Sequence, residues 1–175
     1  MKNCLIVIMV FATLFSSCER KNKFNINDYV QHDVTDLEYT SSDNLVRVPF
    51  KNSGGIKTVQ CLINGSILTD MILDSGCSGA LISISEAQYL WSRGELTSDD
   101  YMGNSQSVIA DGSIVENMVF NIKSIVIADK IECRNVEVTV SANPGAPLLL
   151  GNEVLDRMPS YTIDNEKDEI VFTVQ

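Results

Sequence analysis

The chain has 175 residues, of which 45% are hydrophobic, so it can form one domain with a substantial core. Its 23 acidic and 13 basic residues give a formal net charge of −10 at pH 7. Proteins that bind nucleic acid need a basic face, so this composition argues against that class of function.

The first segment is predicted to be a signal peptide covering residues 1–17. Lys2 precedes an apolar run from Cys4 to Phe15, which is too short to span a bilayer but suits the apolar core of a signal peptide. Ser16-Ser17-Cys18 then resembles a bacterial lipobox, although Phe15 stands where leucine is usual. The resemblance implies lipidation of Cys18 and anchoring to a membrane of the bacterial cell envelope. An ordinary secreted protein is the alternative.

Residues 18–44 are predicted to be a polar tether between the lipid and a folded domain at residues 45–175. The tether is predicted because this stretch is polar and lacks apolar periodicity. Three cysteines fall in the domain, Cys61, Cys77 and Cys133, and no C-x-x-C spacing indicates a metal site. A Cys61–Cys133 disulfide is one interpretation. We prefer the interpretation that all three cysteines are small, buried, apolar side chains.

From Leu45 onward the pattern is mainly that of β-strands. Alternating apolar residues up to Ile63, followed by Asn64-Gly65, predict a hairpin whose second strand, Ile67–Leu73, runs into Asp74. A short helix is expected at residues 85–93, with Ser85 as its N-cap.

The second half of the domain is predicted to hold another hairpin, centred on Asp111-Gly112, and several further strands. The alternating apolar residues shift from odd-numbered to even-numbered positions near Arg134-Asn135, which favours a β-bulge there. Asn152 is expected to cap a short helix at residues 153–158. Many short strands separated by turns indicate a small barrel or sandwich. The other predicted strands lie at residues 118–127, 131–140, 148–150, 160–164 and 169–174.

Most kinds of catalytic site are excluded by residue type. A serine or cysteine triad needs a basic partner, usually histidine, and the single histidine is His32 in the tether. Ser78 lies in Gly-Cys-Ser-Gly rather than in a G-x-S-x-G elbow. One histidine also rules out an H-E-x-x-H zinc site, and no cofactor motif is present. A carboxylate is the remaining candidate for chemistry.

Leu73-Asp74-Ser75-Gly76-Cys77-Ser78 resembles the active-site loop of the aspartic proteases, hydrophobic-Asp-Thr/Ser-Gly-x-Ser. Leu149-Leu150-Gly151, followed by Val154-Leu155, is similar to the second motif of that family. The order of the elements matches the single-domain, retropepsin-like group over roughly residues 45–175. The resemblance implies a mainly β fold, a small closed β-barrel with one or two short helices. Serine replaces the commoner threonine at Ser75, and a helix is predicted after the Asp loop.

The resemblance implies an aspartic endopeptidase that hydrolyses peptide bonds through a water held between two carboxylates. One Asp-Ser-Gly per chain then requires a homodimer in which Asp74 of each copy supplies one carboxylate. Ser75 would link the two loops and Gly76 would allow close backbone approach. Ser78 would bond the outer oxygen of Asp74. Active-site support would come from Leu149, Leu150 and Gly151.

The tip of the second hairpin is expected to act as a flap over an extended peptide substrate bound as an added strand. An ordinary Asp-Gly hairpin is the simpler alternative. The last strand, Ile170 to Val174, is expected at the dimer interface. Two other functions remain open, an inactive module of this fold that binds peptides at the envelope and a purely structural lipoprotein. The proposed flap residues are Ala110, Asp111, Gly112 and Ser113.

Overall fold

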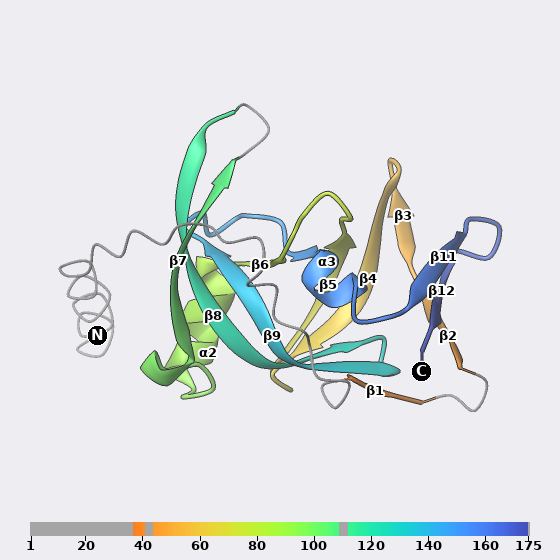
Figure 1. Cartoon of the computed structure of the whole chain (residues 1–175), viewed down its shortest axis with the longest axis horizontal. Coiled ribbons are helices and arrows are strands. Elements are labelled where there is room, and N and C mark those ends of the chain that lie inside the picture. The colour runs from red at the N-terminus through yellow and green to blue at the C-terminus, as the bar shows by residue number, and fades with distance from the viewer. Residues whose placement is uncertain (1–36, 41–43, 109–111, 175) are drawn as a thin grey trace. The chain divides into compact units, whose positions relative to one another are not determined.

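Strands make up most of the domain in the computed structural model, which describes residues 37–40, 44–108 and 112–174 (Figure 1). The predicted signal peptide, Cys18, Ala110 and Asp111 lie outside the described residues. Within them, no helix has the length and hydropathy needed to cross a membrane. The described strands form two sheets, one of nine strands and one of three.

The larger sheet has the strand order β1-β9-β6-β10-β5-β4-β8-β7, with β3 paired to β4. Strand β8 also pairs with β9, although the two are not neighbours in this order. Prediction and structure agree on a mainly β fold with two short α-helices in the described residues, and closure of the strands into one small barrel stays a prediction. The nine strands are β1 (Leu37–Tyr39), β3 (Lys51–Ser53), β4 (Ile56–Ile63), β5 (Ile67–Leu73), β6 (Ala80–Ser83), β7 (Tyr101–Val108), β8 (Ile114–Ile127), β9 (Ile131–Ser141) and β10 (Leu149–Leu150).

The smaller sheet consists of β11 (Ser160–Asp164), β12 (Glu169–Thr173) and β2 (Leu45–Pro49). The last strand, β12, is its central strand, antiparallel to both neighbours. Ile170, Phe172 and Val174 are buried, as their alternation predicts. Both edges of this strand are therefore paired within the chain, so it has no free edge with which to pair with a second copy at the expected dimer interface.

The predicted turn at Asn64-Gly65 is confirmed. Both residues have positive φ, +48° and +70°, and Ser66 N–H donates to Ile63 O at 2.9 Å. Asparagine and glycine tolerate this left-handed conformation better than other residues, which is why the pair favours tight hairpins. The turn sets the register in which β4 pairs with β5, and so fixes where β5 ends.

Both predicted helices are present, but the N-cap of each lies one or two residues before the predicted N-cap. Helix α2 (Ile84–Ser92) has Ser83 as its N-cap, and a capping box joins Ser83 to Glu86. The S-x-x-E spacing of these residues was a sequence signal for this start. Helix α3 (Asn152–Leu155) has Gly151 as its N-cap. A short 3₁₀ helix, η2 (Ser98–Asp100), precedes β7.

The predicted β-bulge near Arg134-Asn135 is wrong. Ile122 pairs with Val136 and Ser124 with Arg134, so the register of β8 and β9 is the same on both sides of this point. The apolar parity changes in both strands together, and Asn135 has a φ of +50°. The two strands therefore change face side by side, without an extra residue in either.

The predicted tether extends too far toward the C-terminus. Leu37–Tyr39 form strand β1, which pairs antiparallel with the edge of β9 and places Leu37 opposite Cys133. Leu37 and Tyr39 pack against the core. The apolar alternation begins at Leu45, but the folded part of the chain begins earlier, at strand β1.

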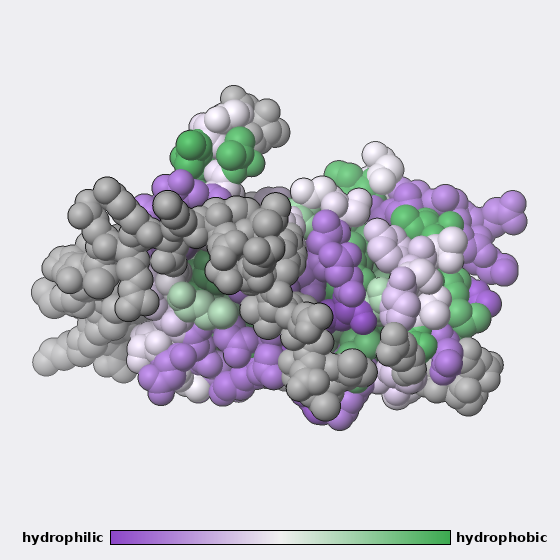
Figure 2. All heavy atoms as spheres, viewed as in Figure 1, coloured by the Kyte–Doolittle hydropathy of each residue, from purple (hydrophilic) through white to green (hydrophobic). Residues whose placement is uncertain are grey.

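Strands β7 and β8 form the second predicted hairpin, and their far ends extend beyond the neighbouring strands (Figure 1). Val108 and Ile114 pair across this end and are 74% and 67% exposed. Figure 2 shows hydrophobic side chains on this projecting end. Gly112 lies in the connection with a φ of +83°, which suits a tight turn.

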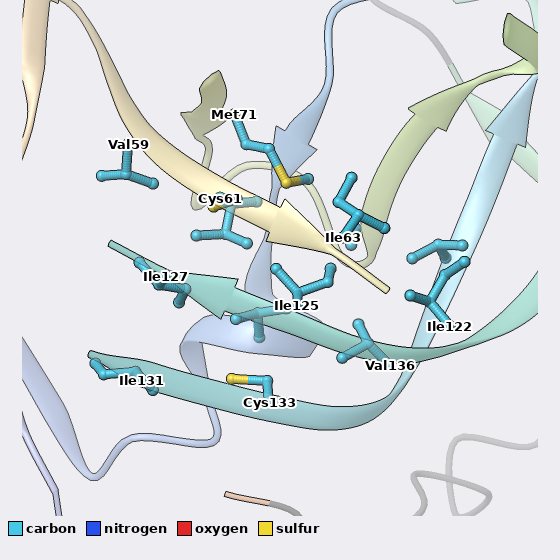
Figure 3. Close-up of a cluster of buried hydrophobic side chains, with 14 of the residues drawn as sticks. Val59, Cys61, Ile63, Met71, Ile122, Ile125, Ile127, Ile131, Cys133 and Val136 are labelled. Atoms are coloured by element: carbon cyan, nitrogen blue, oxygen red, sulfur yellow. The ribbon is translucent and has the colours of Figure 1, made fainter. Parts of the chain in front are cut away.

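A buried cluster joins β4, β5, β8 and β9, and Figure 3 shows Cys61 and Cys133 within it. Both cysteines are fully buried and free, so the Cys61–Cys133 disulfide is not formed. Burial raises the pKa of each thiol to about 12, so both remain protonated at neutral pH. The reading of these cysteines as small apolar core residues agrees with the structure.

Candidate active site

The Asp74 loop is built on three short strands. Strand β5 enters the loop and β6 leaves it, and β10 lies between them, parallel to β5 and antiparallel to β6. Leu149 pairs with both Ile72 and Leu81. Because of these pairings, the two motifs that are distant in the sequence are adjacent in the fold.

Asp74 is half-buried at the end of β5. Its backbone N–H donates to Leu150 O at 3.1 Å, and its carbonyl accepts from Cys77 N–H at 3.1 Å. Its Oδ1 accepts a hydrogen bond from Gly76 N–H at 2.9 Å. The carboxylate is therefore held directly by a backbone N–H of its own loop.

Two glycines allow this close packing. A Cβ at Gly76 would lie 3.1 Å from Asp74 Oδ1, so a side chain there would crowd the carboxylate. A Cβ at Gly151 would lie 2.0 Å from Gly79 O and 2.6 Å from Cys77 O, which is a direct clash with the backbone. Gly151 is thus required by the contact of β10 and α3 with the Asp loop.

The structure brings together one group of the predicted site residues: Asp74, Ser75, Gly76, Ser78, Leu149, Leu150 and Gly151. Ser75 and Ser78 are exposed, and their hydroxyls make no hydrogen bond within the described part of the chain. The expected bond from Ser78 to Asp74 is therefore absent there, and Gly76 N–H is the donor to Asp74 instead. Gly112 and Ser113 lie separately, in the β7–β8 connection.

Cys77 is half-buried beside Asp74 and is a free thiol. Burial raises its pKa, the Gly79 backbone hydrogen bond lowers it, and the nearby Asp74 raises it, with a net increase. A raised pKa disfavours the reactive thiolate, so Cys77 is a poor nucleophile. Across the ranges that the structure describes, no cluster of histidine, cysteine or acidic side chains could hold a metal ion.

Sequence reasoning missed two side chains, one that bonds the loop and one that follows helix α3. The Asn152 amide donates from Nδ2 to Ser75 O at 3.1 Å, although the sequence predicted Asn152 as a helix cap. Arg157 is a buried cation, with a side chain that is only 2% exposed, and it bonds Glu153 Oε1 at 2.6 Å. The sequence signal for Arg157 was its position four residues after an acidic residue.

Comparison with known proteins shows a family and a fold for this chain. The model of the family described as gag-polyprotein putative aspartyl protease matches residues 59–157, which include both the Asp loop and Gly151. Among solved structures, a retropepsin-like aspartic protease from Rickettsia conorii is similar with a TM-score of 0.51 and 19% sequence identity. The match covers 79% of this chain and 93% of that one. No curated protein matches the chain.

Because the family model spans more than half of the sequence, the chain belongs to this aspartyl protease family. The similarity to the Rickettsia structure shows that the fold is retropepsin-like. Family membership supports a protease function.

Proposed function

We propose that this protein is a homodimeric aspartic endopeptidase in which the two copies of Asp74 form the catalytic pair. The observation that carries the proposal is the Asp74 carboxylate, held by Gly76 N–H in a loop supported by Leu150 and Gly151. The family match supports the reaction class. The single Asp-Ser-Gly of the chain supports the need for a second copy.

The mechanism follows from two carboxylates that share one proton. Two such groups about 3 Å apart cannot both be ionised at low cost, as is general in aspartic proteases. The ionised Asp74 takes a proton from the water as its oxygen attacks the substrate carbonyl carbon. The protonated Asp74 of the other copy donates its proton to the carbonyl oxygen. Collapse of this tetrahedral intermediate breaks the C–N bond, and the proton taken from water passes to the leaving amine. One hydroxyl proton of the intermediate returns to the Asp74 that had protonated the carbonyl oxygen, so the pair again shares one proton.

Two other aspartates in the described ranges have partners that fit structural roles. Asp164 accepts hydrogen bonds from the Glu166 and Lys167 backbone N–H groups, both at 3.1 Å, and so stabilises the β11–β12 turn. Asp70 bonds Lys51 Nζ at 2.6 Å on the exposed side of β5. These interactions favour a second chain as the source of the second carboxylate.

The dimer interface requires a different strand from the one first expected. Since β12 is paired on both sides, an interface that extends the smaller sheet would use an outer edge of β2 or β11. The Asp74 loops would meet at the two-fold axis, where a residue can lie opposite its own copy. Exposed Ser75 is available to bond the partner's loop there.

The β7–β8 hairpin is proposed as the flap, with residues 110–113 at its tip. Its exposed Val108 and Ile114 provide apolar surface where a bound peptide could be covered (Figure 2). An extended peptide would bind through main-chain hydrogen bonds, with side-chain pockets providing selectivity.

Mixing copies of the protein tests the function and the dimer together. Wild-type protein should cleave members of a diverse peptide mixture, and increasing amounts of Asp74→Asn protein should inhibit it. Heterodimers would form with only one ionisable carboxyl at the pair. Cleavage is measured by mass spectrometry. As the control, Asp70→Asn protein is added in the same amounts in place of Asp74→Asn protein. If activity per wild-type chain were unchanged in the mixture, a single chain would hold both carboxylates.

We also propose that Cys18 carries lipid and anchors the enzyme to a membrane of the bacterial cell envelope. The support is the lipobox-like Ser16-Ser17-Cys18 after an apolar segment. Two or more acyl chains hold a protein stably at a bilayer, whereas one holds it only marginally. Anchoring would also raise the local concentration of copies and favour dimers.

Replacing Cys18 with alanine should abolish incorporation of labelled fatty acid and release the protein from the membrane fraction. The measurement is metabolic acyl labelling followed by fractionation, with Cys4→Ala as the matched cysteine variant. A mature chain that retains residues 1–17 would contradict the anchor.

A further inference from the structure

A single peptide unit next to Asp74 is held from both sides. The Ser75 carbonyl accepts the Asn152 amide, with a distance of 3.1 Å from Nδ2 to O. The Gly76 N–H of the same peptide unit donates to Asp74 Oδ1 at 2.9 Å. A peptide unit is planar and, in its trans form, directs its C=O and N–H to opposite sides. Fixing the carbonyl therefore fixes the direction of the N–H that holds the carboxylate.

Asn152 also holds the loop through its backbone. Its N–H donates to Cys77 O at 2.9 Å, and the next residue, Glu153, donates from its N–H to Ser78 O at 2.9 Å. With the Asp74 N–H to Leu150 O bond, four hydrogen bonds join residues 150–153 to residues 74–78. Of these four, the Asn152 amide makes the one bond that depends on the identity of a side chain.

Helix α3 is itself fixed to the larger sheet. Arg157 donates to Arg134 O and to Asn135 O, where β9 changes face, and also to Glu153 O. Its ion pair with Glu153 is largely buried, with exposed fractions of 2% and 15%. A buried guanidinium with this many acceptors permits little movement. Asn152 therefore acts from a platform with a defined position relative to the loop.

We propose that Asn152 is a positioning residue for catalysis, which orients the Asp74 carboxylate by holding the peptide unit between Ser75 and Gly76. The inference rests on the proposed protease function. Asn152 is not proposed to touch the substrate. Its loss should lower kcat, since the carboxylate is misaligned, while KM changes little.

The test compares Asn152→Ala with Asn152→Gln, which keeps a carboxamide donor, and with Asn165→Ala, an exposed asparagine in the β11–β12 turn. In the full chain, kcat should fall about tenfold in the alanine variant, with recovery in the glutamine variant. The Gly76 amide should exchange with solvent about two- to tenfold faster in the alanine variant, as expected for one lost hydrogen bond. Asn165→Ala should match wild type in both measurements.

The exchange measurement, made by NMR, separates this proposal from the function on which it rests. If wild type cleaves no peptide, the protease function fails, while the Gly76 exchange rate still shows whether Asn152 holds the peptide unit. A wild-type Gly76 exchange rate in Asn152→Ala would overturn the proposal, as would an unchanged kcat. If the alanine variant does not fold, Asn152→Asp has a similar shape without the donor and should show the same faster exchange.

Discussion

Replacing Asp74 with asparagine is expected to reduce peptide cleavage by about a thousandfold or more, since it removes the acid and the base of both subunits. The side chain keeps its size and its ability to accept from Gly76 N–H, so the fold should be retained. Cleavage of a peptide mixture, measured by mass spectrometry at equal concentrations of folded protein, provides the comparison. Circular dichroism checks the fold.

Asp70→Asn is the matched control because Asp70 lies four residues before Asp74, within β5, and pairs with Lys51 at the surface. It should cleave like wild type. Chelators and serine- or cysteine-directed reagents should leave wild-type activity intact, since the proposed reaction uses no metal ion and no serine or cysteine nucleophile. Substantial cleavage by purified, folded Asp74→Asn protein would show that the active aspartate is not Asp74.

Gly151→Ala is expected to lower the free energy of unfolding by about 3 kcal/mol, or to prevent folding altogether, because overpacking is costly in a rigid site. The added Cβ would lie 2.0 Å from Gly79 O and 2.6 Å from Cys77 O. Both contacts are with backbone atoms, so no side chain can move aside. Relief requires β10 and the Asp74 loop to separate, which would also displace Asp74. Denaturant unfolding provides the measurement.

Gly145→Ala is the matched control, since its Cβ would lie 3.7 Å from Asn143 Oδ1, an ordinary contact. It should change the free energy of unfolding by no more than about 0.5 kcal/mol. If Gly151→Ala were as stable as this control, the packing of Gly151 against the loop would be incorrect.

Local patterns in the sequence predicted most of the strands well. Strands β4 and β5 and the Asn64-Gly65 turn follow from apolar alternation and from two residues that accept positive φ. These properties depend on a few adjacent residues, so they can be predicted without knowledge of the fold. The capping box of Ser83 and Glu86 was equally local, and it would have corrected the predicted cap at Ser85.

Long-range pairing accounts for the features that the patterns did not predict. Strand β1 is short and polar on one side, and it is ordered because the edge of β9 supplies its partners. The parity change near Asn135 looked like a bulge, since one strand alone cannot show that its partner changes face at the same level. The pairing of β12 with both β2 and β11 was hidden for the same reason.

The sequence by itself determined the chemistry of the candidate site, because it offers an Asp-Ser-Gly motif and has no histidine in the domain that could act as a base. The position of that aspartate was decided only by the tertiary structure. Strand β10 inserts between β5 and β6, and its backbone holds the loop at Leu150 O. Neither segment encodes this register alone, because backbone hydrogen bonds are the same for every residue type. Asn152 shows the consequence, since its side chain reaches Ser75 only once the two segments are packed together.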